Sequence, residues 1–234
     1  MRYIEKTDAL CKKVDDFYAG KKSKTEYDYP FVREQLESVY GKCCAYCGIR
    51  IVESKANIEH FYPKAKDDYK KYRRDFRNLH YSCWGCNQAK LTADMTHVMS
   101  PNYYLEDGVW KVSPMEIREH LHYTAFMLFP NVKDQNHKGL CTIRELKLNK
   151  RASLLEERIR KLNEVKSLLE DVVELLENYC KEKDARLEKK FADLVRMVSR
   201  KESFSEMVLQ NYGEDIERLL KVWGRCRGII VPKF

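Results

Sequence analysis

Two Cys-x2-Cys pairs constrain the fold of this chain more than any other feature of its sequence. Cys44-Ala-Tyr-Cys47 and Cys83-Trp-Gly-Cys86 are separated by 35 residues. Each pair places two thiols at a tight turn, and two such pairs supply the tetrahedral sulfur set that a structural zinc ion prefers. A redox function fits less well, since thioredoxin-like Cys-x2-Cys sites occur singly within a βαβ pattern, which the sequence lacks. We therefore predict one Zn²⁺ ion bound by Cys44, Cys47, Cys83 and Cys86.

Cys43 leaves one ambiguity in this assignment. It could replace Cys44 at Cys-x3-Cys spacing, but the matching spacing of the second pair favours Cys44. The remaining cysteines have no paired spacing, and we expect them to be core or surface thiols. They are Cys11, Cys141, Cys180 and Cys226.

The cysteine content also bears on the compartment. Nine cysteines in 234 residues would suggest a disulfide scaffold in a secreted protein. However, the first residues lack the apolar segment of a signal peptide, and the longest uncharged apolar stretch, residues 123–130, is far shorter than the roughly 18 residues that cross a bilayer. We therefore expect a cytoplasmic protein without membrane segments, in which metal binding explains the paired cysteines.

Positive charge is concentrated in the middle of the chain. The formal net charge is +8, and residues 42–90 hold eleven Lys or Arg against five Asp or Glu. Residues 151–222, by contrast, are close to neutral. A basic segment in an otherwise balanced chain indicates a polyanionic partner, although lysine-rich loops are also common as plain solvated surface.

The last third of the chain has a helical pattern. Between residues 151 and 221 there is no proline and a single glycine, and apolar residues recur at steps of three and four. They are Leu155, Ile159, Leu162, Val165, Leu169, Val172 and Leu176. This periodicity predicts a long amphipathic helix, followed by shorter helices at about 184–200 and 203–223. A further helix is expected at about 31–40, and residues 100–149 read as short elements joined by turns.

The segment between the cysteine pairs contains the candidate catalytic residues. Apolar and polar side chains alternate from residue 57 and the pattern stops at Pro63. This predicts a short strand that ends in a turn. Glu59 and His60 would lie on opposite faces of that strand or splayed at its end. Further on, Asn78 precedes the second cysteine pair, and Asn87 follows it at the expected start of a helix.

At these residues the sequence resembles the HNH endonuclease family. Its ββα-metal site has an acidic-His pair on a strand, a central Asn and a closing His or Asn on a helix, often beside two Cys-x2-Cys zinc pairs. The matching features, in the family's order, are Cys44/Cys47, Glu59-His60 with Pro63, Asn78-Leu79, Cys83/Cys86-Asn87 and Lys90.

The resemblance implies a role for each matched residue. His60 would be the general base that activates water, Glu59 and Asn87 would hold one divalent cation, Mg²⁺ or Mn²⁺, and Asn78 would orient the loop and the histidine. Two departures from the commonest pattern are Glu59, where Asp is frequent, and Asn87 as the closing residue. Phosphodiester hydrolysis suits these residue types, because a histidine base and one metal ion can divide nucleophile activation and charge neutralisation between them. Basic residues nearby would form a phosphate-binding surface. They are Lys64, Lys66, Lys70, Lys71, Arg73, Arg74, Arg77 and Lys90.

The similarity extends over most of residues 1–160. The opening residues 1–6, the Cys-Ala-Tyr-Cys-Gly sequence, residues 58–64 and the segments 142–149 and 154–158 look like the PtuB-like HNH subunit of Septu and retron-associated anti-phage systems. That resemblance implies a nuclease working beside an ABC/AAA-type, PtuA-like ATPase subunit. In retron versions it would also work beside a reverse transcriptase with its single-stranded DNA.

Together these features predict an α+β, predominantly helical protein with a zinc-buttressed ββα-metal HNH core and an appended C-terminal helical region. We expect an N-terminal helical segment (1–40), the nuclease core (41–98), a connecting segment of short elements (99–150) and a helical partner-docking region (151–234). The alternatives are a zinc module that binds nucleic acid without cutting it, or a scaffold whose helices hold partner proteins. DNA and RNA, including tRNA, both stay open as substrates, because such a site reads backbone geometry and not bases.

Overall fold

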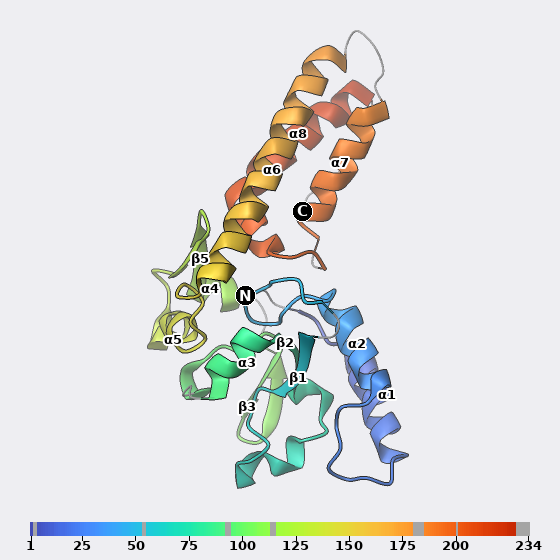
Figure 1. Cartoon of the computed structure of the whole chain (residues 1–234), viewed down its shortest axis with the longest axis vertical. Coiled ribbons are helices and arrows are strands. Elements are labelled where there is room, and N and C mark those ends of the chain that lie inside the picture. The colour runs from blue at the N-terminus through green and yellow to red at the C-terminus, as the bar shows by residue number, and fades with distance from the viewer. Residues whose placement is uncertain are drawn as a thin grey trace.

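The computed structural model describes residues 1, 4–52, 55–91, 95–112, 116–179, 185–199 and 201–227. Helices and short antiparallel hairpins make up one end of the molecule, and three long helices form an elongated arm at the other (Figure 1). The predicted α+β, predominantly helical class is therefore confirmed. Among the helices described, none is long and apolar enough to span a membrane. Cys180 and the last seven residues of the expected docking region lie outside the described residues.

The elements follow one another along the chain as short pieces first and long helices last. The α-helices are α1 (Asp8–Ala19), α2 (Pro30–Tyr40), α3 (Trp84–Leu91), α4 (Glu116–His120), α5 (Lys138–Glu145), α6 (Ala152–Tyr179), α7 (Ala185–Met197) and α8 (Ser205–Arg227). The strands are β1 (Ala56–His60), β2 (Leu79–Cys83), β3 (Tyr103–Glu106), β4 (Val109–Val112), β5 (Leu121–Thr124) and β6 (Met127–Pro130). Short 3-10 helices lie at Asp67–Tyr72, Phe76–Asn78, Met95–His97 and Gln135–His137.

A ββα unit carries the residues singled out in the sequence. Strands β1 and β2 pair antiparallel, with Glu59 opposite His80 and His60 opposite Leu79, and α3 packs against both strands. Directly opposite residues of an antiparallel pair share a face, and consecutive residues alternate. Glu59 and His80 therefore lie on one face of the hairpin, and His60 lies on the other.

Gly41 ends α2 and makes room for a distant segment. Its φ of +59° is the left-handed conformation that commonly terminates a helix and that glycine adopts without a steric cost. A Cβ atom at this position would overlap the backbone of Lys201, in the segment between α7 and α8. The glycine thus serves both the helix end and the close approach of the two segments.

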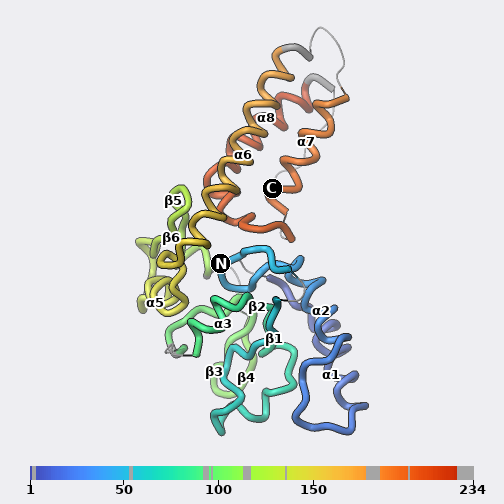
Figure 2. The backbone as a smooth tube through the Cα atoms, viewed as in Figure 1, coloured from blue at the N-terminus to red at the C-terminus, as the bar shows by residue number. Residues whose placement is uncertain are grey.

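Helix α6 connects two hydrophobic cores. Its first turns contribute Leu154 and Leu162 to a core that also contains residues of the three segments expected before it, 1–40, 41–98 and 99–150. Its later turns contribute Val165 and Val172 to a second core shared with α7 and α8. Figure 2 shows α6 running without interruption from the base of the arm towards its tip. We propose that residues 1–150 and the start of α6 form one folding unit, which merges three of the segments expected from the sequence.

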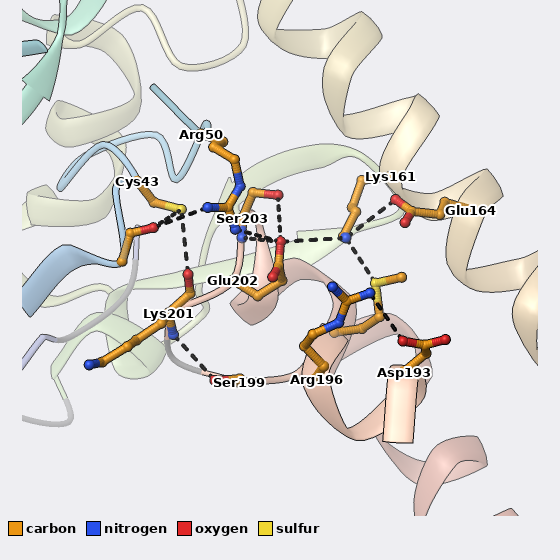
Figure 3. Close-up of polar contacts among 12 residues, drawn as sticks. Cys43, Arg50, Lys161, Glu164, Asp193, Arg196, Ser199, Lys201, Glu202 and Ser203 are labelled. Carbon is orange, nitrogen blue, oxygen red and sulfur yellow. Dashed lines mark hydrogen bonds and ion pairs between the residues drawn. The ribbon is translucent and has the colours of Figure 1, made fainter. Parts of the chain in front are cut away.

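Polar contacts add to the packing where the arm meets the ββα region (Figure 3). Arg50, just after the first cysteine pair, places its Nη2 atom 2.8 Å from Oε1 of Glu202. The same oxygen lies 4.0 Å from Nζ of Lys161 on α6, whose side chain is buried. Glu202 is therefore shared between the arm and the loop that carries the first cysteine pair.

Candidate functional site

The four paired cysteines meet at one point. Their sulfur atoms all lie within 4.8 Å of one another, and the Sγ atoms of Cys47 and Cys83 are 3.7 Å apart. A tetrahedral zinc site with Zn–S bonds of about 2.3 Å places its sulfur atoms about 3.8 Å apart, so the spacing fits this ion. Cys44, Cys47 and Cys86 are buried and Cys83 is half-buried. Because this arrangement matches a closed structural site, the donor set suits Zn²⁺ in a stabilising role.

Cys43 is not part of this cluster. Its Sγ atom contacts the carbonyl oxygens of Gly41, at 3.5 Å, and Lys201, at 3.8 Å. Cys44 instead turns inward, where its backbone N–H donates to the carbonyl of Ile49 at 2.8 Å. The structure therefore agrees with the choice of Cys44 that the matching spacing favours.

Glu59 lies buried against α3 in a network of hydrogen bonds. Nζ of Lys90 is 2.5 Å from Oε2 of Glu59, and the hydroxyl of Tyr46 donates to Oε1. The Lys90 ammonium also donates to the carbonyl oxygens of His60 and, at 3.2 Å, of Phe61. Burial lowers the pKa of Lys90, and the Glu59 carboxylate opposes that effect. All three ammonium protons thus have oxygen acceptors.

His80, the cross-strand neighbour of Glu59, is fully buried and packs as a core residue. Its Nδ1 atom lies 2.6 Å from the hydroxyl of Tyr40, which donates onward to Oδ1 of Asn102. Burial holds the pKa of His80 well below its usual value, so the ring is neutral. Its Nε2 atom has no hydrogen-bond partner within the described part of the chain.

His60 points to the opposite face of the hairpin. Its Nε2 atom lies 2.8 Å from the carbonyl oxygen of Arg73, and its ring meets the edge of Tyr27 at a centroid distance of 4.4 Å. Because a carbonyl oxygen can only accept, Nε2 carries the proton and Nδ1 keeps its lone pair. None of the described residues hydrogen-bonds to Nδ1. Burial lowers the pKa of His60 to about 4, so the imidazole is neutral at neutral pH.

Asn78 closes the loop that follows β1. Its side chain is fully buried, its Oδ1 atom accepts from the N–H of Tyr62 at 2.8 Å, and its Nδ2 atom donates to the carbonyls of Tyr62 and Tyr72 at 3.1 and 3.3 Å. Since Arg73, whose carbonyl contacts His60, directly follows Tyr72, Asn78 supports the backbone that orients the histidine.

Asn87 lies in the first half of α3 and is half-buried. It directly follows Cys86, so the cysteine cluster fixes its place in the helix. Its side-chain amide has no hydrogen bond to any described residue. The amide oxygen of Asn87 therefore remains available to a ligand.

The predicted phosphate-binding residues divide into two groups. Lys66 and Lys71 are exposed, Lys70 is exposed in an ion pair with Asp67, and Arg73 is half-buried. Lys64 is half-buried, with its Nζ atom 2.6 Å from the hydroxyl of Tyr27.

The second group is committed to internal contacts. Arg74 donates to the carbonyls of Tyr18 and Ser23, and Arg77 pairs with a set of carboxylates. Those carboxylates belong to Asp8, Asp15 and Asp75. Lys90 is buried on Glu59. The expectation that Arg74, Arg77 and Lys90 belong to an exposed basic surface is thus corrected, because protein oxygens already bind their charges.

Two other contacts of this site are not predicted from the sequence. Tyr46 reaches Glu59 from inside the first cysteine pair, and Arg151 places Nη2 at 3.1 Å from Sγ of Cys86, which lies 65 positions earlier. No periodicity or motif spacing in the sequence relates these positions. The loop of the first cysteine pair reaches the hairpin, where the N–H of Ala45 donates to the carbonyl of Tyr81 at 2.9 Å, and Arg151 reaches Cys86 from the residue just before α6.

Comparison with known proteins agrees with this geometry. Residues 44–92 match the family model of the HNH endonucleases, a range that contains both cysteine pairs and the residues from Glu59 to Lys90 discussed above. No curated protein gives a significant match to the chain. The chain carries an HNH endonuclease domain, which supports a nuclease of the HNH type with nucleic acid as its substrate.

Proposed function

We propose that this protein is a metal-dependent HNH endonuclease in which His60 is the general base for phosphodiester hydrolysis. The observation that supports this proposal is the protonation state of the His60 ring. The ring is neutral, with its proton on Nε2 and a free lone pair on Nδ1. A general base needs an unprotonated lone pair at the working pH, and Nδ1 of this ring supplies one. Nδ1 takes a proton from water, the resulting oxygen attacks phosphorus, the scissile P–O bond breaks, and the leaving oxygen takes a proton from solvent.

Glu59 and Asn87 would hold the divalent cation, Mg²⁺ or Mn²⁺. One carboxylate and one carboxamide are oxygen donors of the kind that Mg²⁺ takes together with waters and substrate phosphate oxygens. A cation held there would supply neutralisation of the charge on the phosphate and on the leaving oxygen. Because the Lys90 ammonium already binds Glu59, a cation would have to compete with it for this carboxylate. We expect binding to be weak before nucleic acid contributes its own oxygens.

Zn²⁺ would have the separate task of holding the ββα unit together. The cluster joins the loop after α2 to the junction of β2 and α3, and a structural zinc site contributes folding free energy directly. Phosphate contacts would come from the residues of the first group, the exposed Lys66, Lys70 and Lys71 together with the half-buried Lys64 and Arg73.

The test is cleavage of plasmid DNA, single-stranded DNA and RNA in Mg²⁺ or Mn²⁺. His60→Ala should reduce the cleavage rate by about 10² to 10⁴-fold, the usual contribution of a general base, while nucleic-acid binding stays intact. His97→Ala provides the control, because His97 is exposed and lies outside the proposed site. Cleavage by His60→Ala at the wild-type rate would remove the mechanism. Binding without cleavage by the wild-type protein would favour the non-cutting module.

We further propose that the nuclease is the effector of an anti-phage complex and that its helical arm docks an ATPase subunit. Besides the resemblance to PtuB-like subunits, the support is a groove of about 560 Å³ between α6 and α8. Apolar residues such as Leu169, Val173 and Leu219 line the groove, and its charged rim holds four acidic and two basic residues. An acidic rim suits a protein surface better than a phosphate backbone.

Single substitutions in this groove test the docking role. Val173→Asp should weaken copurification with a coexpressed PtuA-like ATPase subunit, because the groove would gain a charge. Val222→Asp is a matched control, since Val222 has an exposed fraction of 45%, close to the 43% of Val173, but does not line the groove. Equal recovery of the ATPase with both variants would place its docking site elsewhere.

A further inference from the structure

We propose that Arg151 supplies the counter-charge of the zinc-bearing cysteine cluster and thereby makes the docking of α6 depend on the metal. Four thiolates and one Zn²⁺ ion carry a net charge of −2. In a largely buried site this charge requires compensation from nearby cations or hydrogen-bond donors. The inference concerns the joint between the ββα unit and the helical arm, and it is independent of whether the protein cleaves nucleic acid.

The guanidinium of Arg151 faces two sulfur atoms of the second cysteine pair. Nη2 lies 3.1 Å from Sγ of Cys86, and Nη1 lies 3.9 Å from Sγ of Cys83. The backbone N–H of Cys86 also points at Sγ of Cys83, at 3.5 Å. A planar guanidinium with parallel N–H groups can serve both sulfur atoms at once, which an ammonium group cannot do in the same way.

Gly85 leaves the space that this arrangement needs. A Cβ atom on Gly85 would lie 2.5 Å from Nη1 of Arg151. Gly85 is the second residue of α3, and any larger residue there would place its Cβ atom against the guanidinium.

Arg151 is also fixed to the start of α6. Its carbonyl accepts from the N–H groups of Leu154 and Leu155, both at 3.1 Å, and its Nε atom donates to the carbonyl of Lys147 at 3.4 Å. Because the side chain binds the sulfur cluster while the backbone begins the helix, movement of the cluster shifts the first turn of α6. Zinc release would remove what holds the four sulfur atoms together and so would loosen this anchor.

Zinc release from the full-length protein tests the counter-charge. Arg151→Met and Gly85→Ala should each release zinc to a chromogenic chelator about 10- to 100-fold faster than wild type, the usual effect of losing a group that supports metal ligands. Gly85→Ala displaces only the tip of a flexible side chain, so it tests the contact even if Arg151→Met fails to fold. Lys150→Met is the control, because it removes an exposed neighbouring charge. Wild-type release rates in both test variants, or equal acceleration in Lys150→Met, would overturn the proposal.

Hydrogen exchange tests the coupling to α6. We expect removal of zinc from the wild-type protein to raise amide exchange in residues 152–162, while the second core at residues 208–220 of α8 stays protected. Gly85→Ala should show part of the same increase with zinc still bound. Unchanged protection of residues 152–162 after zinc removal would refute metal-dependent docking.

Discussion

The buried pair of Lys90 and Glu59 allows a sharp prediction about stability. The side chains are only 7% and 4% exposed, and the ammonium donates to one carboxylate and two carbonyl oxygens. Lys90→Met would leave the carboxylate of Glu59 buried with Tyr46 as its remaining donor. Leaving a buried charge without its partner costs about 3–5 kcal/mol of unfolding free energy.

The double variant makes the prediction specific. Glu59→Gln removes the charge but keeps a hydrogen-bond acceptor, so combining it with Lys90→Met should recover at least about 1 kcal/mol of the loss. Urea unfolding of all four proteins at pH 7 with zinc present measures both effects. Additive losses, or a cost below about 1 kcal/mol for Lys90→Met alone, would refute the reasoning.

Three further predictions rest on single positions. Burial lowers the pKa of Lys6 to about 7 from 10.5, so the unfolded chain holds a proton that the folded protein lacks between these pH values. Wild type should therefore gain stability relative to Lys6→Met as the pH rises from 7 to 10, by up to about 4 kcal/mol, and a pH-independent difference in urea midpoints would contradict this. Gly41→Ala should lower the melting temperature more than Gly108→Ala, because both glycines have positive φ but only Gly41 faces another backbone. Lys66→Ala and Lys71→Ala should each reduce the salt dependence of nucleic-acid binding by about one unit of slope, measured by titration at several salt concentrations.

Local patterns in the sequence predict much of the architecture. The recurrence of apolar residues places a helix over α6, and strand alternation allows Glu59 and His60 to lie on opposite faces, as the register of β1 with β2 shows. The spacing of the cysteine pairs predicts which four sulfur atoms come together. Each of these features depends on residues within a few turns or on a motif with a fixed geometry.

Long-range contacts account for what the sequence does not predict. Lys90 looks like a surface lysine on a short helix, and only the packing of α3 on β1 shows that its charge is buried. Arg77 belongs to a run of basic residues, yet carboxylates of α1 bind it. Charge counts along the chain cannot separate such residues from exposed ones like Lys66, because burial is decided by elements distant in sequence.

The continuity of α6 has a mechanical consequence. A helix of 28 residues is about 42 Å long at 1.5 Å per residue, so a rotation with its first turn as fulcrum, next to the contact of Arg151 with the cysteine cluster, would be amplified at its far end. A tilt of about 5° at that fulcrum moves the far end by about 4 Å, given this length. A partner bound at the tip of the arm would therefore exert leverage on its base, where α3 carries Asn87 and Lys90 and Lys90 binds Glu59.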